Sequence, residues 1–398
     1  MRATLQIGLL VFLNFVLLLR PPVSRAATQG SLDQLLDSAE DRFRKGDLPG
    51  AEKILLSAEK TNPRSFVVRN NLGALYLQLR RYADAVREFS AAAALNPRSP
   101  DAVRGLGTAY FLSGDYAAAL KPLERAKELD PRDLRTRYQR GYALLMLNRP
   151  EEARPELEMV RREMPADPNT LFALVKVYAA SRDSENANRA FSVLQQSAPD
   201  SVFVHILLGE SYDLQENWAS AIAEYQRAIE LAPAMPRLHF DLGFLHWEQA
   251  HYPEAKAEFE KELKLNPGFV PALYYLGDIA LNSEQPSEAL ELFRSASTRN
   301  PACLEPWLGQ GKALVRLNRP AEALAHFQKA AAIDAGQADV YYWMATAYRR
   351  LQRPAESSEA MEQFKTLSEK AKAAGAGAGR KDRWSSPACE SGWGSLRP

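Results

Sequence analysis

The sequence predicts an all-α protein built from about ten stacked helix pairs, and three regular features predict it. A proline returns every 34 residues, at Pro63, Pro97, Pro131, Pro165, Pro199, Pro233, Pro267 and Pro301. A small residue usually follows each proline by ten positions. An alanine stands twelve positions further on, and a large apolar residue four beyond it. A fixed period of roughly 20 to 50 residues indicates stacked repeats rather than one globular core.

The small and large positions predict how each helix pair packs. The small residues are Gly73, Gly107, Gly141, Gly209, Gly243, Gly277, Gly311 and Ala345, with Val175 as the exception. The alanines are Ala85, Ala119, Ala153, Ala187, Ala221, Ala255, Ala289 and Ala323, and the large residues are Phe89, Leu123, Leu157, Phe191, Tyr225, Phe259, Phe293 and Phe327. At helical spacing these residues form two facing apolar stripes. We expect the glycine and the alanine to allow the two backbones to approach closely.

The prolines and the short polar turns predict where the helices end. A proline removes a backbone donor and restricts the residue before it, so it fits the junction where the second helix of a unit stops. Turn signals between the two helices of a unit include Gly114-Asp115, Arg182-Asp183 and Asn318-Arg319-Pro320.

This pattern resembles the tetratricopeptide repeat, whose motif of Trp, Leu-Gly, Tyr, Ala, Phe, Ala and Pro is matched in most units. Trp307 even supplies the opening tryptophan of one unit. The resemblance implies a right-handed superhelical solenoid of ten units over residues 32–371, namely 32–65, 66–99, 100–133, 134–167, 168–201, 202–235, 236–269, 270–303, 304–337 and 338–371.

The two ends of the chain differ from the repeats. Residues 1–26 carry Arg2, a short apolar run from Leu5 to Leu19 and the small residues of Ser24-Arg25-Ala26, a pattern typical of a secretory signal. We predict cleavage after Ala26, with an uncleaved membrane anchor as the alternative. Residues 27–31 are predicted as a short linker, and residues 372–398, rich in Ala, Gly, Ser and Pro, as a disordered tail.

The signal predicts an exported protein, periplasmic or extracellular. Residues 1–26 hold three arginines and no acid, so 47 basic and 49 acidic residues remain after cleavage. This balance provides no basic stripe for nucleic acid. The two cysteines, Cys303 and Cys389, either form a disulfide in an oxidising compartment or remain two separate thiols.

The sequence contains no motif that predicts catalysis. It lacks a Gly-rich phosphate loop, His-Glu-x-x-His, Cys-x-x-Cys and a nucleophile elbow, so we predict a non-enzyme without a cofactor or metal. His205, His239 and His246 form the one regular histidine feature and leave a metal site as a minor alternative. The favoured interpretation is that each imidazole fills an aromatic position between paired helices.

In the tetratricopeptide repeat family, the first helix of each unit lines a concave surface on which partners bind. Carried onto this chain, the inward positions contain aromatic residues flanked by a basic region and an acidic region. We predict a partner-binding groove formed by Arg104, Arg135, Tyr138, Tyr142, Phe172, Lys176, Phe203, Glu210, Asp213, Phe240, Phe244, Trp247, Tyr274 and Asp278. Aromatic and arginine residues are the usual energetic anchors of interfaces.

The sequence therefore predicts an exported, non-catalytic scaffold that binds a protein or peptide in its groove, in envelope assembly or secretion. The alternative is an accessory subunit of a carbohydrate- or polymer-processing complex, in which the aromatic side chains stack on sugars. Charged peptide contacts weaken with salt, whereas stacking on sugars does not, so salt distinguishes the two.

Overall fold

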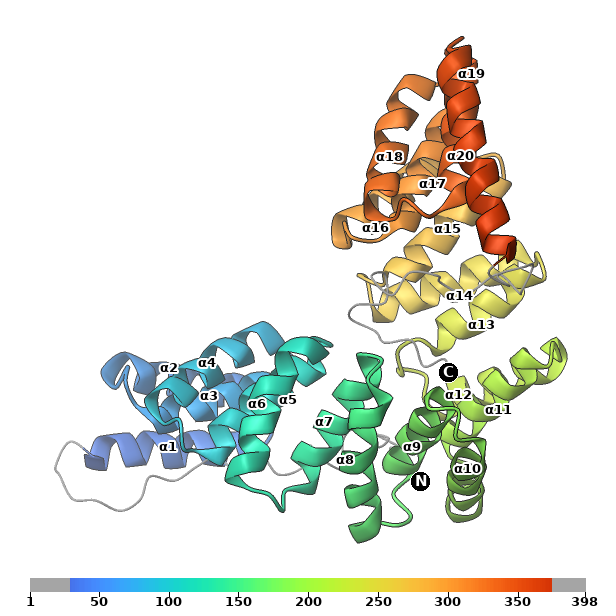
Figure 1. Ribbon diagram of the computed structural model, residues 1–398. Helices are drawn as coiled ribbons and strands as arrows, with labels where there is room; N and C mark the ends of the chain where they lie inside the picture. Colours follow the sequence, from blue (N-terminus) through green and yellow to red (C-terminus); the bar gives the residue numbers. More distant parts are fainter. Residues whose placement is uncertain (1–28, 374–398) are drawn as a thin grey trace. The chain divides into compact units, whose positions relative to one another are not determined.

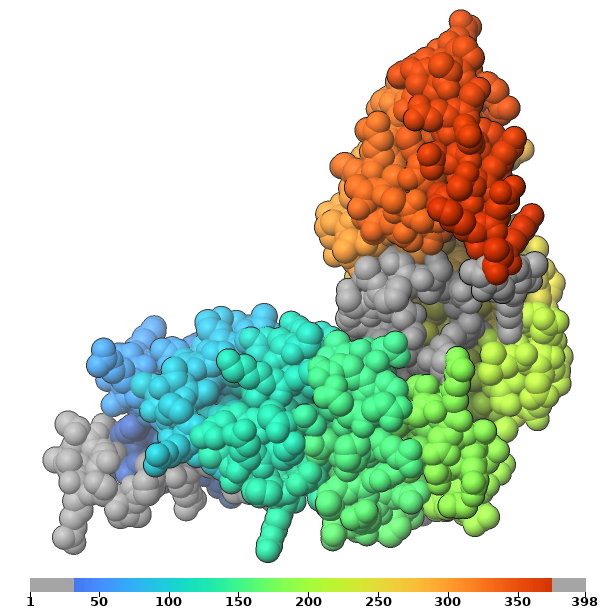
Figure 2. Space-filling view, in the orientation of Figure 1, coloured from blue at the N-terminus to red at the C-terminus, as the bar shows by residue number. Residues whose placement is uncertain are grey.

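The computed structural model describes residues 29–373, and all twenty elements of this range are α-helices (Figure 1). The chain divides into two compact units, with the boundary between Val204 and His205. Space-filling side chains close the gaps between neighbouring helices within each unit (Figure 2). The predicted signal and the predicted disordered tail from residue 374 onward lie outside the described residues.

Consecutive antiparallel pairs build the first unit. Its helices are α1 (Gln29–Arg44), α2 (Leu48–Thr61), α3 (Phe66–Gln78), α4 (Tyr82–Leu95), α5 (Pro100–Leu112), α6 (Tyr116–Leu129), α7 (Leu134–Met146), α8 (Pro150–Glu163), α9 (Pro168–Ala180) and α10 (Ser184–Ser197). The next helix, α11 (Val202–Leu214), contains the boundary between the units.

The second unit repeats the same construction. Its helices after α11 are α12 (Trp218–Leu231), α13 (Leu238–Glu248), α14 (Tyr252–Leu265), α15 (Val270–Asn282), α16 (Pro286–Arg299), α17 (Leu304–Arg316), α18 (Pro320–Ile333), α19 (Ala338–Arg350) and α20 (Pro354–Ala373). The prediction of an all-α stack of helix pairs is confirmed.

The ends of the stack differ slightly from the predicted boundaries. Helix α1 already begins at Gln29, inside the predicted linker, because residues 29–31 include no proline to prevent helix formation. Helix α20 runs through Lys372 to Ala373, two residues into the predicted tail. Within the described range, no helix has the length and apolarity that crossing a membrane would require.

Ten residues with a left-handed backbone form the turns inside the helix pairs. They recur every 34 residues, at Gly46, Arg80, Gly114, Asn148, Arg182, Glu216, Ala250, Glu284, Asn318 and Gln352, with φ between 55° and 81°. Only two of them are glycine, although this conformation costs other residues about 1–2 kcal/mol. The predicted turn positions are confirmed, and the backbone geometry of the turn is the same in both units.

The glycine ten residues after each proline makes room for a large side chain on the second helix. A Cβ atom added at Gly73 would lie 2.8 Å from the ring of Phe89, and one at Gly107 would lie 2.6 Å from Leu123. A Cβ atom at Gly105 of the next pair would lie even closer to the ring of Phe89, so this side chain packs against two neighbouring pairs.

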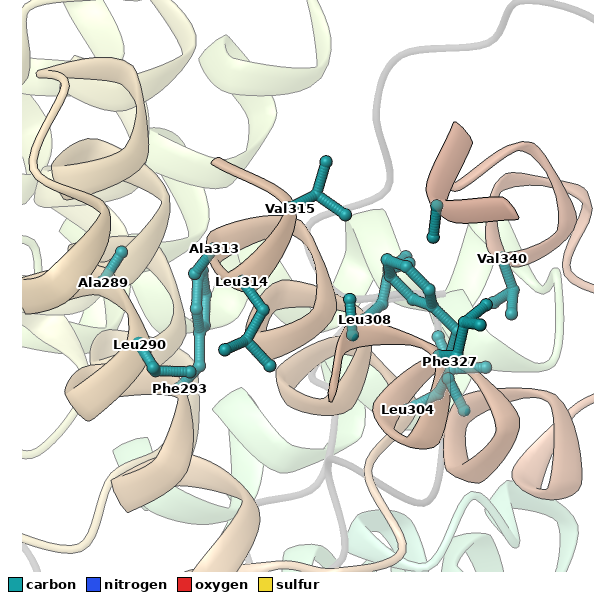
Figure 3. Close-up of a cluster of buried hydrophobic side chains, with 14 of the residues drawn as sticks. Ala289, Leu290, Phe293, Leu304, Leu308, Ala313, Leu314, Val315, Phe327 and Val340 are labelled. Atoms are coloured by element: carbon teal, nitrogen blue, oxygen red, sulfur yellow. The ribbon is translucent and has the colours of Figure 1, made fainter. Parts of the chain in front are cut away.

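The core continues along each unit as a series of such contacts. In the second unit, Phe293 and Phe327 are almost fully buried between neighbouring pairs, together with Leu304, Leu314 and Val340 (Figure 3). Each pair thus buries its apolar stripe only against its neighbours, as expected for a repeat protein.

Candidate functional site

Polar side chains near the start of several first helices reach across to the second helix of the same pair. We call this contact the cross-helix pair: the fourth residue of a predicted unit bound to the residue 19 positions later. Arg69 donates to Glu88 at 2.7 Å and Arg137 donates to Glu156 at 2.9 Å. In the second unit, imidazoles replace the arginines. His205 Nδ1 lies 2.7 Å from Glu224, and His239 Nδ1 lies 2.6 Å from Glu258.

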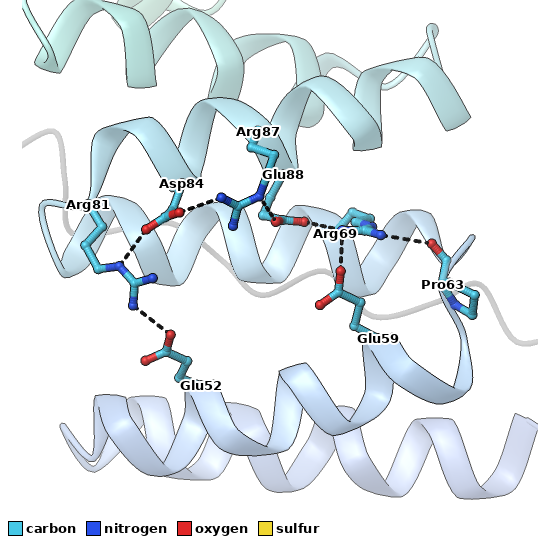
Figure 4. A network of polar contacts seen from close by, with 8 residues as sticks. All are labelled: Glu52, Glu59, Pro63, Arg69, Arg81, Asp84, Arg87 and Glu88. Atoms are coloured by element: carbon cyan, nitrogen blue, oxygen red, sulfur yellow. Dashed lines mark hydrogen bonds and ion pairs between the residues drawn. The ribbon is translucent and has the colours of Figure 1, made fainter.

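The arginines of the cross-helix pairs also join neighbouring helix pairs. Arg69 contacts Glu59 of α2 as well as Glu88 of α4, within a network that includes Arg81 and Asp84 (Figure 4). Arg69 further donates to the carbonyl oxygen of Pro63, six residues earlier. Arg137 and Trp307 make the same contact to the prolines six residues before them. The recurring proline is therefore also an acceptor for the side chain that opens the next helix.

These contacts argue against a metal site at the three histidines. His205 and His239 each bind a glutamate of their own helix pair. Burial lowers the pKa of His246. Among residues 29–373, no cluster of three or more His, Cys, Asp or Glu side chains is arranged to hold a metal ion. The imidazoles of His205 and His239 are thus engaged within their own helix pairs, as the favoured interpretation expects.

The basic part of the predicted groove lies in the first unit. Arg104 pairs with Asp101 on α5 and reaches Asp133, which lies before α7, at 3.4 Å. Asp133 also accepts hydrogen bonds from the Arg135 backbone and from Thr136. Burial, together with the charge of Arg104, lowers the pKa of Arg135. The structure thus brings two half-buried guanidinium groups close together.

Two tyrosines follow Arg135 on α7, at Tyr138 and Tyr142. Tyr142 makes edge contacts with Phe111 at 5.7 Å and lies 6.0 Å from Tyr138, between ring centroids. Burial raises the pKa of Tyr138 well above its ordinary value, and it does the same for Tyr116 nearby. Both phenols therefore remain neutral at physiological pH and present hydrogen-bonding groups without charge.

Further along the first unit, two phenylalanines form the next aromatic contact. Phe172 of α9 and Phe203 of α11 lie 4.8 Å apart between ring centroids, and both are largely buried. The Lys176 ammonium is 5.8 Å from the Phe172 ring. All seven predicted groove residues of the first unit thus belong to α5, α7, α9 and the start of α11.

In the second unit, five of the predicted groove residues lie in or at the edge of one aromatic cluster, namely Phe240, Phe244, Trp247, Tyr274 and Asp278. Phe240 contacts Phe244, Phe259, Phe269 and Tyr275, and only 2% of its surface is exposed. Phe244 is also fully buried. The rings of these two residues are part of the packing between helix pairs. Any direct contact between them and a partner remains a prediction.

Trp247 and Asp278 lie at the partly exposed edge of this cluster. The Trp247 indole donates to the Asp278 carboxylate at 2.9 Å, and Asn282 donates to the same oxygen at 3.1 Å. Tyr274 lies beside Tyr275 and Phe293, and burial raises the pKa of its hydroxyl. Of the two remaining acidic residues, Glu210 is partly exposed and Asp213 is buried.

Sequence reasoning missed Tyr275 and Phe269, which complete the aromatic cluster. Both positions interrupt the inward pattern, because Tyr275 is adjacent to a predicted groove residue and Phe269 precedes α15. It also missed Glu262, a fully buried carboxyl group on α14. A signal for Glu262 was present: the equivalent positions 34 residues apart are all apolar, at Ala92, Ala126, Val160, Leu194, Ala228, Ala296 and Ala330.

The chain belongs to the tetratricopeptide repeat family. Tetratricopeptide repeat models match residues 36–86, 70–133, 240–302, 276–338 and 308–371, a further one matches 110–175, and a TPR repeat model matches 209–249. Comparison with curated protein sequences gave no match. Repeats of this family generally bind proteins or peptides and generally form non-catalytic scaffolds.

Two solved structures show the same fold at low sequence identity. The APC/C hetero-tetramer Cut9-Hcn1 matches at 16% identity with a TM-score of 0.58, over 85% of this chain and 66% of that chain. This chain therefore spans just under two thirds of that relative. A monomeric mutant of IFIT1 with Gppp-AAAA matches at 16% identity and a TM-score of 0.52, over 86% of this chain and 82% of that one.

Proposed function

We propose that this protein is an exported scaffold that binds a segment of a protein partner along the first helices of its repeats. The observation that carries the proposal is the chemistry of α5 and α7. There, two half-buried guanidinium groups, Arg104 and Arg135, interact electrostatically, and α7 also carries the partly exposed ring of Tyr142 two turns after Arg135. Arginine and tyrosine are enriched among the residues that dominate binding energy at interfaces. A segment with acidic and apolar side chains complements such a surface.

The second unit offers a surface of different chemistry. Trp247 and Asp278 combine an aromatic ring with a carboxylate. Glu210 of α11 is a further partly exposed carboxylate of this unit. A segment with a basic or polar part complements these groups. We infer that the two units bind different parts of one partner, or different partners. We propose export from the sequence pattern of residues 1–26, and a role in envelope assembly or secretion follows only from that proposal.

The test is a quantitative pull-down from an envelope extract with the full chain and two matched double variants. Arg104→Gln with Arg135→Gln removes the two charges of the proposed surface. Lys121→Gln with Arg132→Gln removes two exposed cations of the same unit and serves as control. We expect a partner that the wild type and the control capture equally and that the first variant captures at least about tenfold less, a loss of ~1.4 kcal/mol. Equal capture by all three chains would contradict binding at this surface.

Salt and soluble glycans separate the protein partner from the polymer alternative. Capture through the arginines should fall as salt rises, because exposed charges are screened. Capture that resists salt, competes with glycans and depends on Tyr142 and Trp247 alone would instead favour an accessory role in a carbohydrate-processing complex. Export is tested separately by the N-terminal mass of the protein in the envelope fraction. We expect the mature chain to begin at Ala27, and a chain that begins at Met1 in the cytosol would contradict it.

A further inference from the structure

Asp278 on α15 is a partly exposed carboxylate that two hydrogen bonds hold in one orientation. The Trp247 indole of α13 donates to its Oδ2 atom at 2.9 Å, and the Asn282 side-chain amide donates to the same oxygen at 3.1 Å. Neither donor carries a charge. Within residues 29–373, no lysine, arginine or histidine forms an ion pair with Asp278, and no hydrogen bond uses its Oδ1 atom. The carboxylate is therefore oriented but not neutralised.

Other carboxylates of the chain that are withdrawn from water do have a cationic partner. Glu88 pairs with Arg69, and Glu156 pairs with Arg137. A carboxylate that has lost part of its hydration gains most from a charged donor, because charge-assisted hydrogen bonds are the strongest ones. The remaining oxygen of Asp278 is thus suited to accept from a cation that a partner supplies.

The Trp247 ring gives that cation an aromatic surface next to the carboxylate. Phe244 stacks on the indole with 5.6 Å between ring centroids, and Tyr275 makes an edge contact with it at 4.8 Å. These contacts fix the ring, which is still partly exposed. Cations are attracted to the face of an indole. The planar guanidinium of arginine both stacks on aromatic rings and donates several N–H groups in its plane, so arginine fits Trp247 and Asp278 together better than lysine.

Two further first helices contribute carboxylates to the same surface. Glu305 of α17 and Asp339 of α19 lie close enough to Tyr274 to raise the pKa of its hydroxyl together with Asp278, although burial is the main cause of that shift. Lys312 follows Glu305 by two turns on α17, and its ammonium lies 5.7 Å from an indole ring of α19. Three successive first helices therefore place one carboxylate each around a single phenol.

The charge of the whole second unit favours the same kind of ligand. Residues 205–373 contain 17 lysines and arginines but 23 aspartates and glutamates, whereas residues 29–204 contain 26 and 24. An excess of negative charge raises the local concentration of cationic groups. The second unit is therefore the part of the chain that attracts a basic segment.

We propose that Trp247 and Asp278 form a recognition site for an arginine side chain of the partner segment. The guanidinium pairs with the Oδ1 atom of Asp278 and covers the indole, while Glu305 and Asp339 attract further basic residues of the segment. This inference rests on the proposed function, because it names the residue type that the second unit selects. The arginine of this site is opposite in charge to the acidic side chains that complement Arg104 and Arg135.

Selection from a library of random short peptides tests the site with three full-length chains. They are the wild type, Asp278→Asn and Glu260→Gln. Asp278→Asn keeps the size of the side chain and an oxygen for the indole N–H but removes the charge. Glu260→Gln removes an exposed carboxylate of α14 in the same unit and is the matched control. We expect arginine to be enriched over the input library by the wild type and the control, and not by Asp278→Asn.

Replacing arginine by citrulline in a selected peptide then measures the charge alone, because citrulline has nearly the same shape and no charge. The wild type should bind the citrulline peptide at least about tenfold more weakly, a difference of ~1.4 kcal/mol. Asp278→Asn should bind both peptides within about twofold of each other, which a purely structural role of Asp278 does not explain. If Asp278→Asn does not fold, the citrulline comparison on the wild type decides.

The outcomes separate this inference from the function on which it rests. Selected peptides without arginine enrichment, equal enrichment by Asp278→Asn, or equal affinity of the wild type for the arginine and citrulline peptides would overturn the arginine site. Each of these results leaves peptide binding by the scaffold intact. A selection in which the wild type retains no peptide would contradict both proposals.

Discussion

The two units share one arrangement of packed helix pairs, but the cross-helix pair contains arginine in the first unit and histidine in the second. In the first unit, Arg69 and Arg137 bind a buried glutamate 19 residues later. In the second unit, His205 and His239 occupy the same place. The guanidinium is a planar, permanently charged group with five N–H donors, whereas the imidazole has only two ring nitrogens. All five histidines of the chain lie between residues 205 and 326, within the second unit.

The repeat therefore determines the backbone geometry of each helix pair but not the charged residues that its cross-helix pair contains. The left-handed turn, the glycine and the facing large apolar residue recur in both units. The histidines do not, because all five lie in the second unit, where burial lowers the pKa of His246 and of His326. We therefore expect both units to respond alike to steric changes and differently to pH.

The largest effect should come from filling the glycine positions. A Cβ atom at Gly107 would lie 3.3 Å from the Leu123 backbone nitrogen, and one at Gly243 would lie 2.9 Å from the Phe259 ring. Gly107→Leu and Gly243→Leu should each destabilise their unit by ~1–3 kcal/mol or more through overpacking. Thermal unfolding followed by circular dichroism measures this loss. Gly268→Leu is the control, because the nearest atom there is 3.8 Å away. An unchanged melting temperature of either variant would show that the two units do not depend alike on these glycines.

The second largest effect should separate the two kinds of cross-helix pair. Glu156 accepts from Arg137, Arg140 and Lys127, and 7% of its side chain is exposed. Glu258 accepts from His239 and Lys261, and 13% of its side chain is exposed. Glu156→Gln should cost roughly 2–3 kcal/mol and Glu258→Gln about 1–2, because hydrogen bonds to charged groups contribute about that much.

Chemical denaturation with exchange read separately in α7–α8 and α13–α14 measures both losses. Glu128→Gln is the control, since its pair with Arg125 is exposed and such pairs contribute about 0–1 kcal/mol. An equal loss in both units would show that charge type has no influence at this position.

A moderate effect should appear on acidification of the second unit. Burial is the main cause that lowers the pKa of His326 on α18, and Lys329 and Arg294 add to it. The folded state then binds fewer protons than the unfolded chain just below pH 6.5, so stability falls as pH decreases through that range. Exchange of α18 amides between pH 5 and 7 measures the change, and His326→Phe should remove it. A matching change in α3–α4, which contain no histidine, would contradict the difference between the units.

The smallest effect should be a gain at the turns. Arg80 and Ala250 have φ of 55° and 58° without being glycine. Arg80→Gly and Ala250→Gly should each stabilise by less than about 1 kcal/mol, because relief of the left-handed strain exceeds the entropy cost of glycine. Gly114→Ala should have the opposite sign. Melting temperatures of the three variants test this, and a loss at Arg80 and Ala250 together would exclude strain at these turns.

Much of this architecture could be predicted from spacing alone. Pro131 and Gly107 are informative, because few other residue types could take the place of either one. Proline restricts where a helix ends, and only a small side chain fits against Leu123. Each requirement recurs in nearly every unit, so even a single exception such as Val175 leaves the period intact.

The candidate site could be predicted only in part. Sequence reasoning assigned aromatic residues to inward positions of the first helices, but the burial of Phe240 depends on Phe259 of α14 and on Phe269, which precedes α15. The partners of His205 and His239 depend on the second helix of each pair. The contact between Glu262 and the Arg237 backbone depends on the left-handed conformation of Arg237, which the residue types around it do not predict. The disulfide between Cys303 and Cys389 stays a prediction, because Cys389 lies outside the described residues.

Exchanging the two kinds of cross-helix pair tests directly whether both units share one arrangement of packed helix pairs. Hydrogen exchange is measured in α7–α8 for Arg137→His and Arg137→Ala, and in α13–α14 for His239→Arg and His239→Ala. If the arrangement is shared, Arg137→His and His239→Arg should keep hydrogen-exchange protection within about threefold of the wild type, a change below ~1 kcal/mol. The alanine variants should lose more. If His239→Arg loses as much protection as His239→Ala, the cross-helix position does not accept either residue in both units, and a shared arrangement is contradicted.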